Sequence, residues 1–277
     1  MPDITYGAAT RVSPHVRRVT ARNSGRMTGP GTNSYIVGER ELAVIDPGPP
    51  LEEHIDALER ITAGRLRSIL VTHTHRDHSP AAAELARRTG AELIGNVIAN
   101  DGYQDASFVG ARALAQDECV LIDGVTVRAI LTPGHVSNHV CYLIEDDRLL
   151  ITGDHVMGGS TVVIVPPAGN MRDYIASLRR MLDYDIASIA PGHGDVIGEP
   201  RRELEHLIAH RLKREQKVVD ALTRLGAARI DALTPLVYDD VDPVMHGWAA
   251  LSLHAHLLKL VADERATVAN DVWQMRG

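Results

Sequence analysis

The stretch Thr72-His73-Thr74-His75-Arg76-Asp77-His78 carries the strongest structural signal in this sequence. It has the form H-x-H-x-D-H, so four side chains of the kinds that bind metals fall within six positions. Alternate side chains of an extended segment point the same way, and we therefore expect His73, His75 and Asp77 to face one cavity with His78 beside them. Imidazole and carboxylate ligands suit zinc, and this segment alone offers more of them than one catalytic zinc takes from a protein.

Three later motifs add further candidate ligands, namely Pro133-Gly134-His135, Gly153-Asp154 and Pro191-Gly192-His193. Each of the four motifs follows a short apolar run of the kind that forms a buried strand. The sequence therefore predicts four strands that each end in a ligand, and a glycine directly before a ligand permits a sharp turn there. Seven candidates in total suit two metals that share a bridging ligand.

At these residues the chain resembles the metallo-β-lactamase superfamily of metallohydrolases. Residues 31–38 followed by 44–48 are similar to the opening hairpin of that family. Residues 173–178 and the tail over 203–259 resemble its lactamase-beta-2-like branch, which carries a small winged-helix-like C-terminal domain. The resemblance spans roughly residues 25–262.

The resemblance implies the division of the ligands between the two metals. It places His73, His75 and His135 on a first zinc. It places Asp77, His78 and His193 on a second zinc, with Asp154 as the bridge between the two. Iron or manganese are the alternative metals. Diiron relatives that reduce oxygen carry a glutamate where this chain has His75, which favours hydrolysis over redox chemistry.

The predicted fold class is α/β (α+β). Tight turns such as Asp123-Gly124 join neighbouring strands, which a purely parallel sheet would not allow. The resemblance implies a four-layer αββα sandwich over residues 1–200. Leucines at helical spacing from Leu204 onward predict a long helix, followed by helices near 231–238 and 248–261. Residues 201–277 are therefore expected to form a small, mostly helical, winged-helix-like domain.

Several local features complete the predicted fold. We expect its first two strands near residues 34–37 and 41–46, and a helix over 51–61. Ser79 is the expected N-cap of a second helix that ends at Gly90. Residues 95–116 are compatible either with a helix or with a mobile rim over the site, and 173–182 are expected to form a helix.

Two metals about 3.5–4 Å apart lower the pKa of a shared water towards 7, so that a metal-bound hydroxide can attack an ester-type bond. Asp77 is the first candidate catalytic residue, because it can orient this hydroxide or accept its proton. His139 is the second, donating to an oxyanion or steadying a ligand, with a structural hydrogen bond as the alternative. Roles for His155 near the metals, and for Asp46 as a partner of a metal-binding histidine or as a turn cap, stay open.

Composition and charge indicate the cellular compartment and restrict the classes of binding partner. The chain has 277 residues and a net charge of −7, which disfavours nonspecific binding to nucleic acid. No stretch is long and apolar enough to span a membrane, and the N-terminus lacks the pattern of a secretory signal. Cys119 and Cys141 are the only cysteines and form no disulfide framework, which favours a cytoplasmic location.

The sequence defines the reaction better than the substrate. The first hypothesis is cleavage of a phosphodiester of single-stranded RNA, and the appended domain and the basic segment 201–217 support it. This segment is either a surface that guides an anionic substrate or a solvated helix face. The alternatives are a glyoxalase II-like thioesterase acting on a small molecule, a lactone or β-lactam hydrolase, and a non-enzymatic binding protein stabilised by metal. The oligomeric state is left open, with a homodimer as one option.

Overall fold

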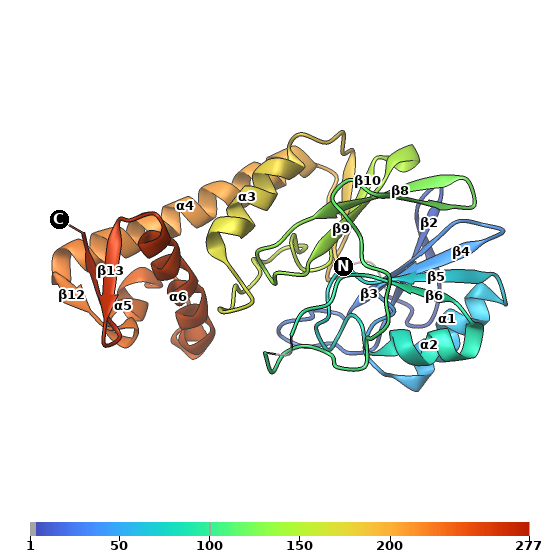
Figure 1. The fold of residues 1–277 in the computed structure, drawn as a ribbon, viewed down its shortest axis with the longest axis horizontal. Helices are drawn as coiled ribbons and strands as arrows, with labels where there is room; N and C mark the ends of the chain where they lie inside the picture. Colours follow the sequence, from blue (N-terminus) through green and yellow to red (C-terminus); the bar gives the residue numbers. More distant parts are fainter. Residues whose placement is uncertain (1–3, 100, 277) are drawn as a thin grey trace. The chain divides into compact units, whose positions relative to one another are not determined.

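The computed structural model describes residues 4–99 and 101–276, which form two compact units (Figure 1). The first unit contains the chain up to residue 132 together with residues 138–161 and 184–201. The second contains residues 133–137, 162–183 and the chain from 202 onward. The predicted division at residue 200 stays a prediction.

The first unit is built on two sheets. The larger has six strands in chain order: β1 (Thr10–Ser13), β2 (Val16–Thr20), β3 (Asn33–Val37), β4 (Leu42–Ile45), β5 (Leu66–Leu70) and β6 (Glu92–Ile94). The smaller runs in the order β11 (Ser188–Ala190), β10 (Leu149–Ile151), β9 (Val140–Ile144), β8 (Val125–Leu131) and β7 (Cys119–Ile122). Both sheets are mixed, since β4, β5 and β6 pair in parallel, as do β10 and β11, whereas the other pairs are antiparallel.

Alternation along the strands gives each sheet an inner and an outer apolar face. Tyr35 and Val37 of β3 belong to a core cluster shared with residues of the smaller sheet. Ile36, between them, packs instead in a cluster with helices α1 (Glu52–Thr62) and α2 (Ala81–Thr89). Figure 1 shows these helices beside β5 and β6. The predicted mixed α/β sandwich is thereby confirmed.

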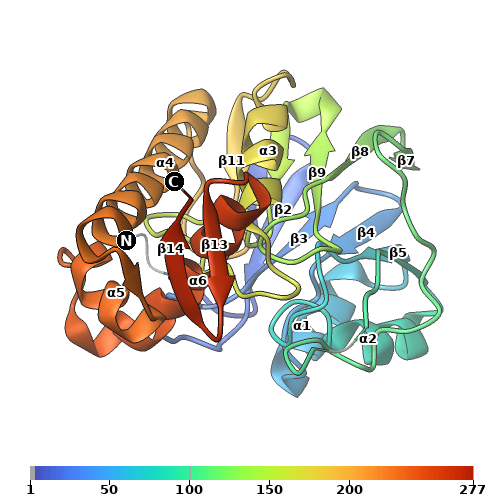
Figure 2. The same ribbon diagram turned by 60° about the vertical axis from the view of Figure 1, so that its left-hand side comes forward.

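The second unit contains α3 (Met171–Met181), the 26-residue α4 (Pro200–Leu225), α5 (Ile230–Val237) and α6 (His246–Ala262). It also has a three-stranded sheet in the order β12 (Ala227–Ala228), β14 (Val272–Met275), β13 (Ala266–Ala269). Figure 2 shows β13 and β14 side by side. Asn270 and Asp271 take positive φ angles at the turn between them, as a tight hairpin requires. This hairpin is the wing that accompanies the predicted helices.

Two local predictions were wrong. The fold opens with β1 and β2, which were missed because Arg17 and Arg18 interrupt the apolar alternation between the buried Val16 and Val19. The N-cap of α2 is Pro80 rather than Ser79, whose hydroxyl donates to Asp105 Oδ2 at 2.7 Å.

For residues 95–116, the structure excludes one of the two alternatives, the helix. The described part of this segment contains no helix, although Phe108 and Leu114 are buried in it.

Among the described residues, no helix is long and apolar enough to cross a membrane.

Candidate metal centre

The first motif forms a turn rather than an extended strand. After β5 the chain reverses, with His78 N and Ser79 N both donating to His75 O, at 3.0 and 3.3 Å. The turn separates the four side chains into two pairs, because His73 and His75 join one group of ligand atoms and Asp77 and His78 join another. The expectation that strand alternation aligns His73, His75 and Asp77 was therefore wrong in its geometry.

The first group consists of His73, His75, His135 and Asp154, whose ligand atoms lie within 4.8 Å of one another. His73 Nε2 and His75 Nδ1 are 3.0 Å apart. His135 Nδ1 contacts the carbonyl oxygen of Val163 at 3.0 Å, which engages that nitrogen and keeps Nε2 for a ligand.

The second group consists of Asp77, His78 and His193. His193 Nε2 lies 3.2 Å from Asp77 Oδ2, and Asp154 Oδ1 lies 3.2 Å from both His193 Nε2 and His78 Nε2. Asp154 therefore belongs to the first group and also contacts two members of the second. A single carboxylate therefore faces ligand atoms of both groups.

Glycines bring the strand ends close to the first motif. A Cβ atom at Gly153, which has φ +45°, would lie 2.4 Å from Thr72 Oγ1. A Cβ atom at Gly192 would lie 2.8 Å from His78 Cε1. The glycine before Asp154 and the one before His193 thus leave room for the neighbouring motif, besides permitting a turn.

The backbone of the motif that ends in His193 is tied to β3. Asn33 N donates to Gly192 O at 2.8 Å, and the Tyr35 hydroxyl donates to Pro191 O at 2.6 Å. On the imidazole itself, Nδ1 lies 3.2 Å from Gly31 O, which directs Nε2 to the two carboxylates. The larger sheet therefore positions a side chain that follows a strand of the smaller one.

Asp46 orients His78. It is buried, takes a φ of 51°, and accepts hydrogen bonds from Thr72 N and Thr72 Oγ1, both at 2.7 Å. Its Oδ2 atom is 2.9 Å from His78 Nδ1, so that Nε2 is the nitrogen that faces the second group. Of the two roles left open for Asp46, these contacts favour that of a partner to a ligand histidine.

His139 and His155 lie behind the ligands. His139 is 1 % exposed, its ring stacks on that of His73 with centroids 5.0 Å apart, and its Nδ1 lies 2.8 Å from Thr132 Oγ1. The ring of His155, also buried, is 5.5 Å from that of His139. This burial favours support of His73 over contact with a substrate; the catalytic role of His139 stays a prediction.

Charge in the second group is concentrated and buried. Burial alone would lower the pKa of His78, but Asp77 and Asp154 raise it well above its usual range. Burial also opposes a raised pKa at His193, yet Asp154 raises it to about 9. Conversely, the two histidines hold the pKa of Asp154 well below its usual range against the effect of burial. Protons on the histidines balance the carboxylates, and a bound dication would take their place.

At His73, in the first group, the raising effect of Asp154 on the pKa is outweighed. Burial lowers the pKa of His73 well below its usual range, and the neighbouring His78 and His75 lower it further. A neutral imidazole is the form that ligates a metal. At the second group, His78 Nε2 is buried and makes no hydrogen bond within the described residues, although two carboxylates face it. The donor types and this buried nitrogen fit a pair of metal ions.

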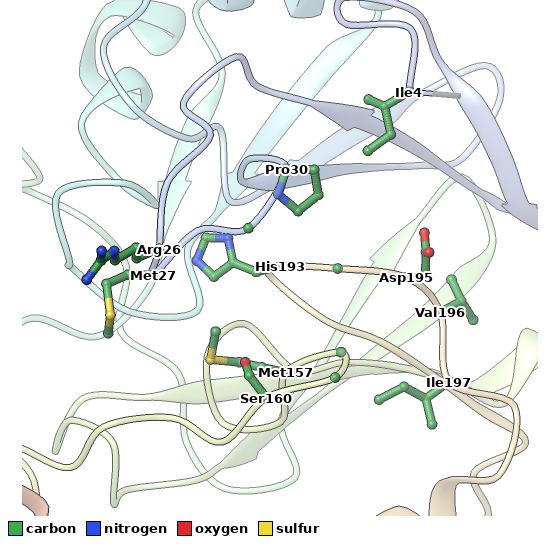
Figure 3. A pocket seen from close by; sticks show the side chains of 14 residues that line it. Ile4, Arg26, Met27, Pro30, Met157, Ser160, His193, Asp195, Val196 and Ile197 are labelled. Carbon is green, nitrogen blue, oxygen red and sulfur yellow. The ribbon is translucent and has the colours of Figure 1, made fainter. Parts of the chain in front are cut away.

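A cavity of about 540 Å³ adjoins the second group, with His193 in its wall (Figure 3). Its remaining lining comes from residues 4, 26, 27, 29, 30, 157–160 and 194–197. None of these was singled out from the sequence, because they lie in irregular loops that carry no motif or periodicity.

The basic segment 201–217 is partly internal. Arg211 is buried and donates to Val162 O, while Arg214 pairs with Asp240 at 2.7 Å. Lys217 pairs with Asp239 at 2.5 Å. Half of the six basic side chains in this segment therefore pair within the second unit itself, which weakens the alternative in which the segment guides an anionic substrate.

Comparison with known proteins defines the class of the chain. The model of the metallo-beta-lactamase superfamily matches residues 27–193, and that of the beta-lactamase associated winged helix domain matches residues 230–273. The chain belongs to the metallo-beta-lactamase superfamily and is a hydrolase of that family.

Its relatives include lactamase-like proteins and thioesterases. The lactamase-like protein ptaB of Pestalotiopsis fici is 28% identical over 266 residues, covering 92% of this chain and 82% of that protein. The lactamase-like protein nscB of Trichophyton rubrum is 34% identical, covering 81% and 66%. An atrochrysone carboxyl ACP thioesterase of Aspergillus terreus is 32% identical, covering 77% and 65%. The chain thus spans just under two thirds of the last two relatives.

Solved structures share the fold. A beta-lactamase domain protein from Burkholderia ambifaria superimposes with a TM-score of 0.82 at 20% identity, covering 100% of this chain and 95% of that one. The metallo-beta-lactamase family protein TTHA1429 from Thermus thermophilus gives a TM-score of 0.78 at 18% identity, covering 96% and 100%.

Proposed function

We propose that this chain is a dinuclear zinc-dependent thioesterase, which hydrolyses the thioester of an acyl group carried on a thiol cofactor or a carrier protein. The observation that carries the dinuclear part is the position of Asp154, in the first ligand group and 3.2 Å from His78 and His193 of the second. The thioester part is supported by relatives named as thioesterases, including those from Aspergillus terreus and Claviceps purpurea.

The proposed ligands are the seven predicted from the sequence. One zinc would be held by His73, His75 and His135, the other by Asp77, His78 and His193, with Asp154 between them. The mixed nitrogen and oxygen donors are those that zinc takes in hydrolytic sites. When bound, two such ions lower the pKa of a shared water and polarise the carbonyl oxygen of the substrate.

The protein side chains would then handle the proton. Asp77 is the candidate base, because its side chain is 29% exposed whereas that of Asp154 is 12% exposed. It would accept the proton of the attacking water and return it to the leaving thiolate, so that thioester and water yield carboxylic acid and thiol. Asp46 would keep His78 in the tautomer whose Nε2 faces the site.

The structure offers less support for a phosphodiester of RNA. Single-stranded RNA binds along basic grooves, often with aromatic side chains between the charges. The chain carries a net charge of −7, and Arg211, Arg214 and Lys217 of α4 are engaged internally. We therefore expect thioesters to be better substrates than RNA.

A hydrolysis panel on zinc-loaded protein tests the proposal. Its substrates are decanoyl-coenzyme A, S-lactoylglutathione, single-stranded RNA, a lactone and a β-lactam. We expect the highest kcat/KM with a thioester, and a loss of roughly a thousandfold in Asp77→Ala, because that change removes both a ligand and the base. Asp123→Ala, an aspartate held by Arg40 in another part of the unit, should retain activity.

Faster cleavage of RNA than of any thioester would overturn the assignment of substrate. Full activity in Asp77→Ala would overturn the role of that residue. Circular dichroism of both variants separates loss of chemistry from loss of fold.

A further inference from the structure

The cavity beside His193 has the size and lining of a site for an organic group. Its volume of about 540 Å³ falls within the range of small-molecule sites. Met27 and Pro30 line it on one side, and Met157 and Ile197 on another. Figure 3 shows these side chains around the hollow, with the imidazole of His193 among them. Methionine side chains adapt to apolar groups of varied shape.

The wall of this cavity is fixed by backbone contacts. Gly158 N donates to His193 O at 3.1 Å. A Cβ atom at Gly194 would lie 2.8 Å from Gly158 O, and that glycine takes a φ of +87°. The loop after Asp154 is therefore held directly against the loop after His193. A site bounded by such loops is formed before a ligand arrives, which lowers the cost of binding.

The two charged side chains that line the cavity lie at opposite ends of it. Asp195 lines the cavity and is 51% exposed, although Arg18 lies 3.4 Å from it. Arg26 also lines the cavity, and Figure 3 shows it beside His193, with Asp195 at the other end. Apolar side chains lie between the two charged residues, so a chain without charge fits the middle of the hollow.

We propose that this cavity binds the apolar acyl group of the substrate and selects for its length. The inference rests on the proposed thioesterase function. His193 connects the two sites, because its ring lines the cavity while its Nε2 lies 3.2 Å from Asp77 and Asp154. An acyl chain seated between Met27 and Met157 would place its carbonyl end at the proposed metal centre. Specificity then depends on apolar area buried in the cavity.

Thioether analogues test this without any turnover. We would titrate S-decyl-coenzyme A and S-ethyl-coenzyme A, which cannot be hydrolysed, into the zinc-loaded full chain by calorimetry. The extra methylenes should give the decyl analogue a roughly tenfold or larger advantage in Kd, with a more negative heat-capacity change. The shared coenzyme A part cancels in this comparison.

Two variants and a matched control localise the effect. Ser160→Trp fills the cavity from an exposed position, and Met27→Asp places a charge on its apolar wall. Both should reduce the decyl advantage to roughly twofold or less. Thr161→Trp adds the same ring at the adjacent exposed residue, which does not line the cavity, and should keep the full advantage.

Equal affinity of the wild type for both analogues would overturn the inference, as would equal effects of Ser160→Trp and Thr161→Trp. A wild type that prefers the decyl analogue but hydrolyses no thioester supports the cavity assignment and contradicts the proposed reaction. A wild type that hydrolyses thioesters without this preference contradicts the cavity assignment alone.

Discussion

Two buried polar clusters in this protein differ in how their charge is balanced. The first, the metal cluster, comprises the seven proposed ligands at the ends of β5, β8, β10 and β11. The second, the α4 network, is centred on Glu215, which is 5% exposed and lies 2.8 Å from Lys259 Nζ and 3.0 Å from Arg265 Nη1. Cations of the protein itself satisfy the carboxylate of Glu215.

The metal cluster has no lysine or arginine among its members. Its carboxylates face imidazoles that can carry a proton or a metal, so the cluster can exchange one cation for another. The α4 network cannot exchange its cations in this way, because they are side chains of the protein. Burial alone would raise the pKa of Glu215, but His256 and Lys259 lower it to about 2. Removing one member of a buried charge network destabilises the fold, because its partners are left uncompensated, whereas convergent ligand atoms indicate a site for an external ion.

Removing the charge of the α4 network should give the largest change in stability. Glu215→Gln removes the carboxylate that faces Lys259 and Arg265; among the described residues, Lys259 keeps its ion pair with Asp263 at 2.7 Å. We expect a loss of about 2–3 kcal/mol in the free energy of unfolding, measured with urea, with or without EDTA. The exposed Asp220 on the same helix gives the control Asp220→Asn. A loss that appears only in the presence of zinc would break the distinction between the clusters.

Changing the orientation of a ligand should act on metal affinity. Asp46→Asn keeps the shape of the side chain and tolerates the positive φ, but one of its contacts to His78 or Thr72 is lost. We expect the affinity for zinc to fall by roughly 10–100-fold in a chelator competition assay. Asp123→Asn is the matched control, because that aspartate also takes a positive φ and accepts from backbone N–H groups. Equal zinc affinity in both variants would contradict the role of Asp46.

The smallest effect concerns pH and a buried histidine outside both clusters. His54 is 2% exposed, its Nε2 lies 2.8 Å from Ser34 Oγ, and burial lowers its pKa to about 4. The unfolded chain takes up a proton near pH 6.5 that the folded chain does not, so stability falls as the pH decreases through that range.

Between pH 7 and 5.5 the wild type should therefore lose about 1 kcal/mol more than His54→Gln in urea unfolding. The exposed His206 provides the control His206→Gln, which should follow the wild type. Parallel curves for the wild type and His54→Gln would show that His54 does not contribute.

The sequence predicted well the strands that precede the candidate ligands, because these strands depend on local patterns. An apolar run followed by a turn and a histidine or aspartate is visible without knowing the fold, and His73, Asp154 and His193 all follow strands as expected. Their assembly could not be derived from those patterns alone. It depends on close approaches such as that of Gly192 to His78, which follow from strand order.

Other features lie beyond sequence patterns for the same reason. Ser79 was the expected N-cap of α2, but Asp105, distant in the sequence, accepts its hydrogen bond. The contact between Asp46 and His78 joins residues 32 positions apart, so its existence could be proposed but not established from the sequence. The cavity beside His193 is formed by loops whose positions depend on both sheets.

The assignment of two metal ions can be checked by elemental analysis of the purified, zinc-saturated chain. We expect about two zinc ions per chain in the wild type, and about one or fewer in Asp154→Ala, which removes the carboxylate shared by both groups. A wild type that retains one ion or none under saturating zinc, or an Asp154→Ala variant that retains two with unchanged affinity, would contradict it.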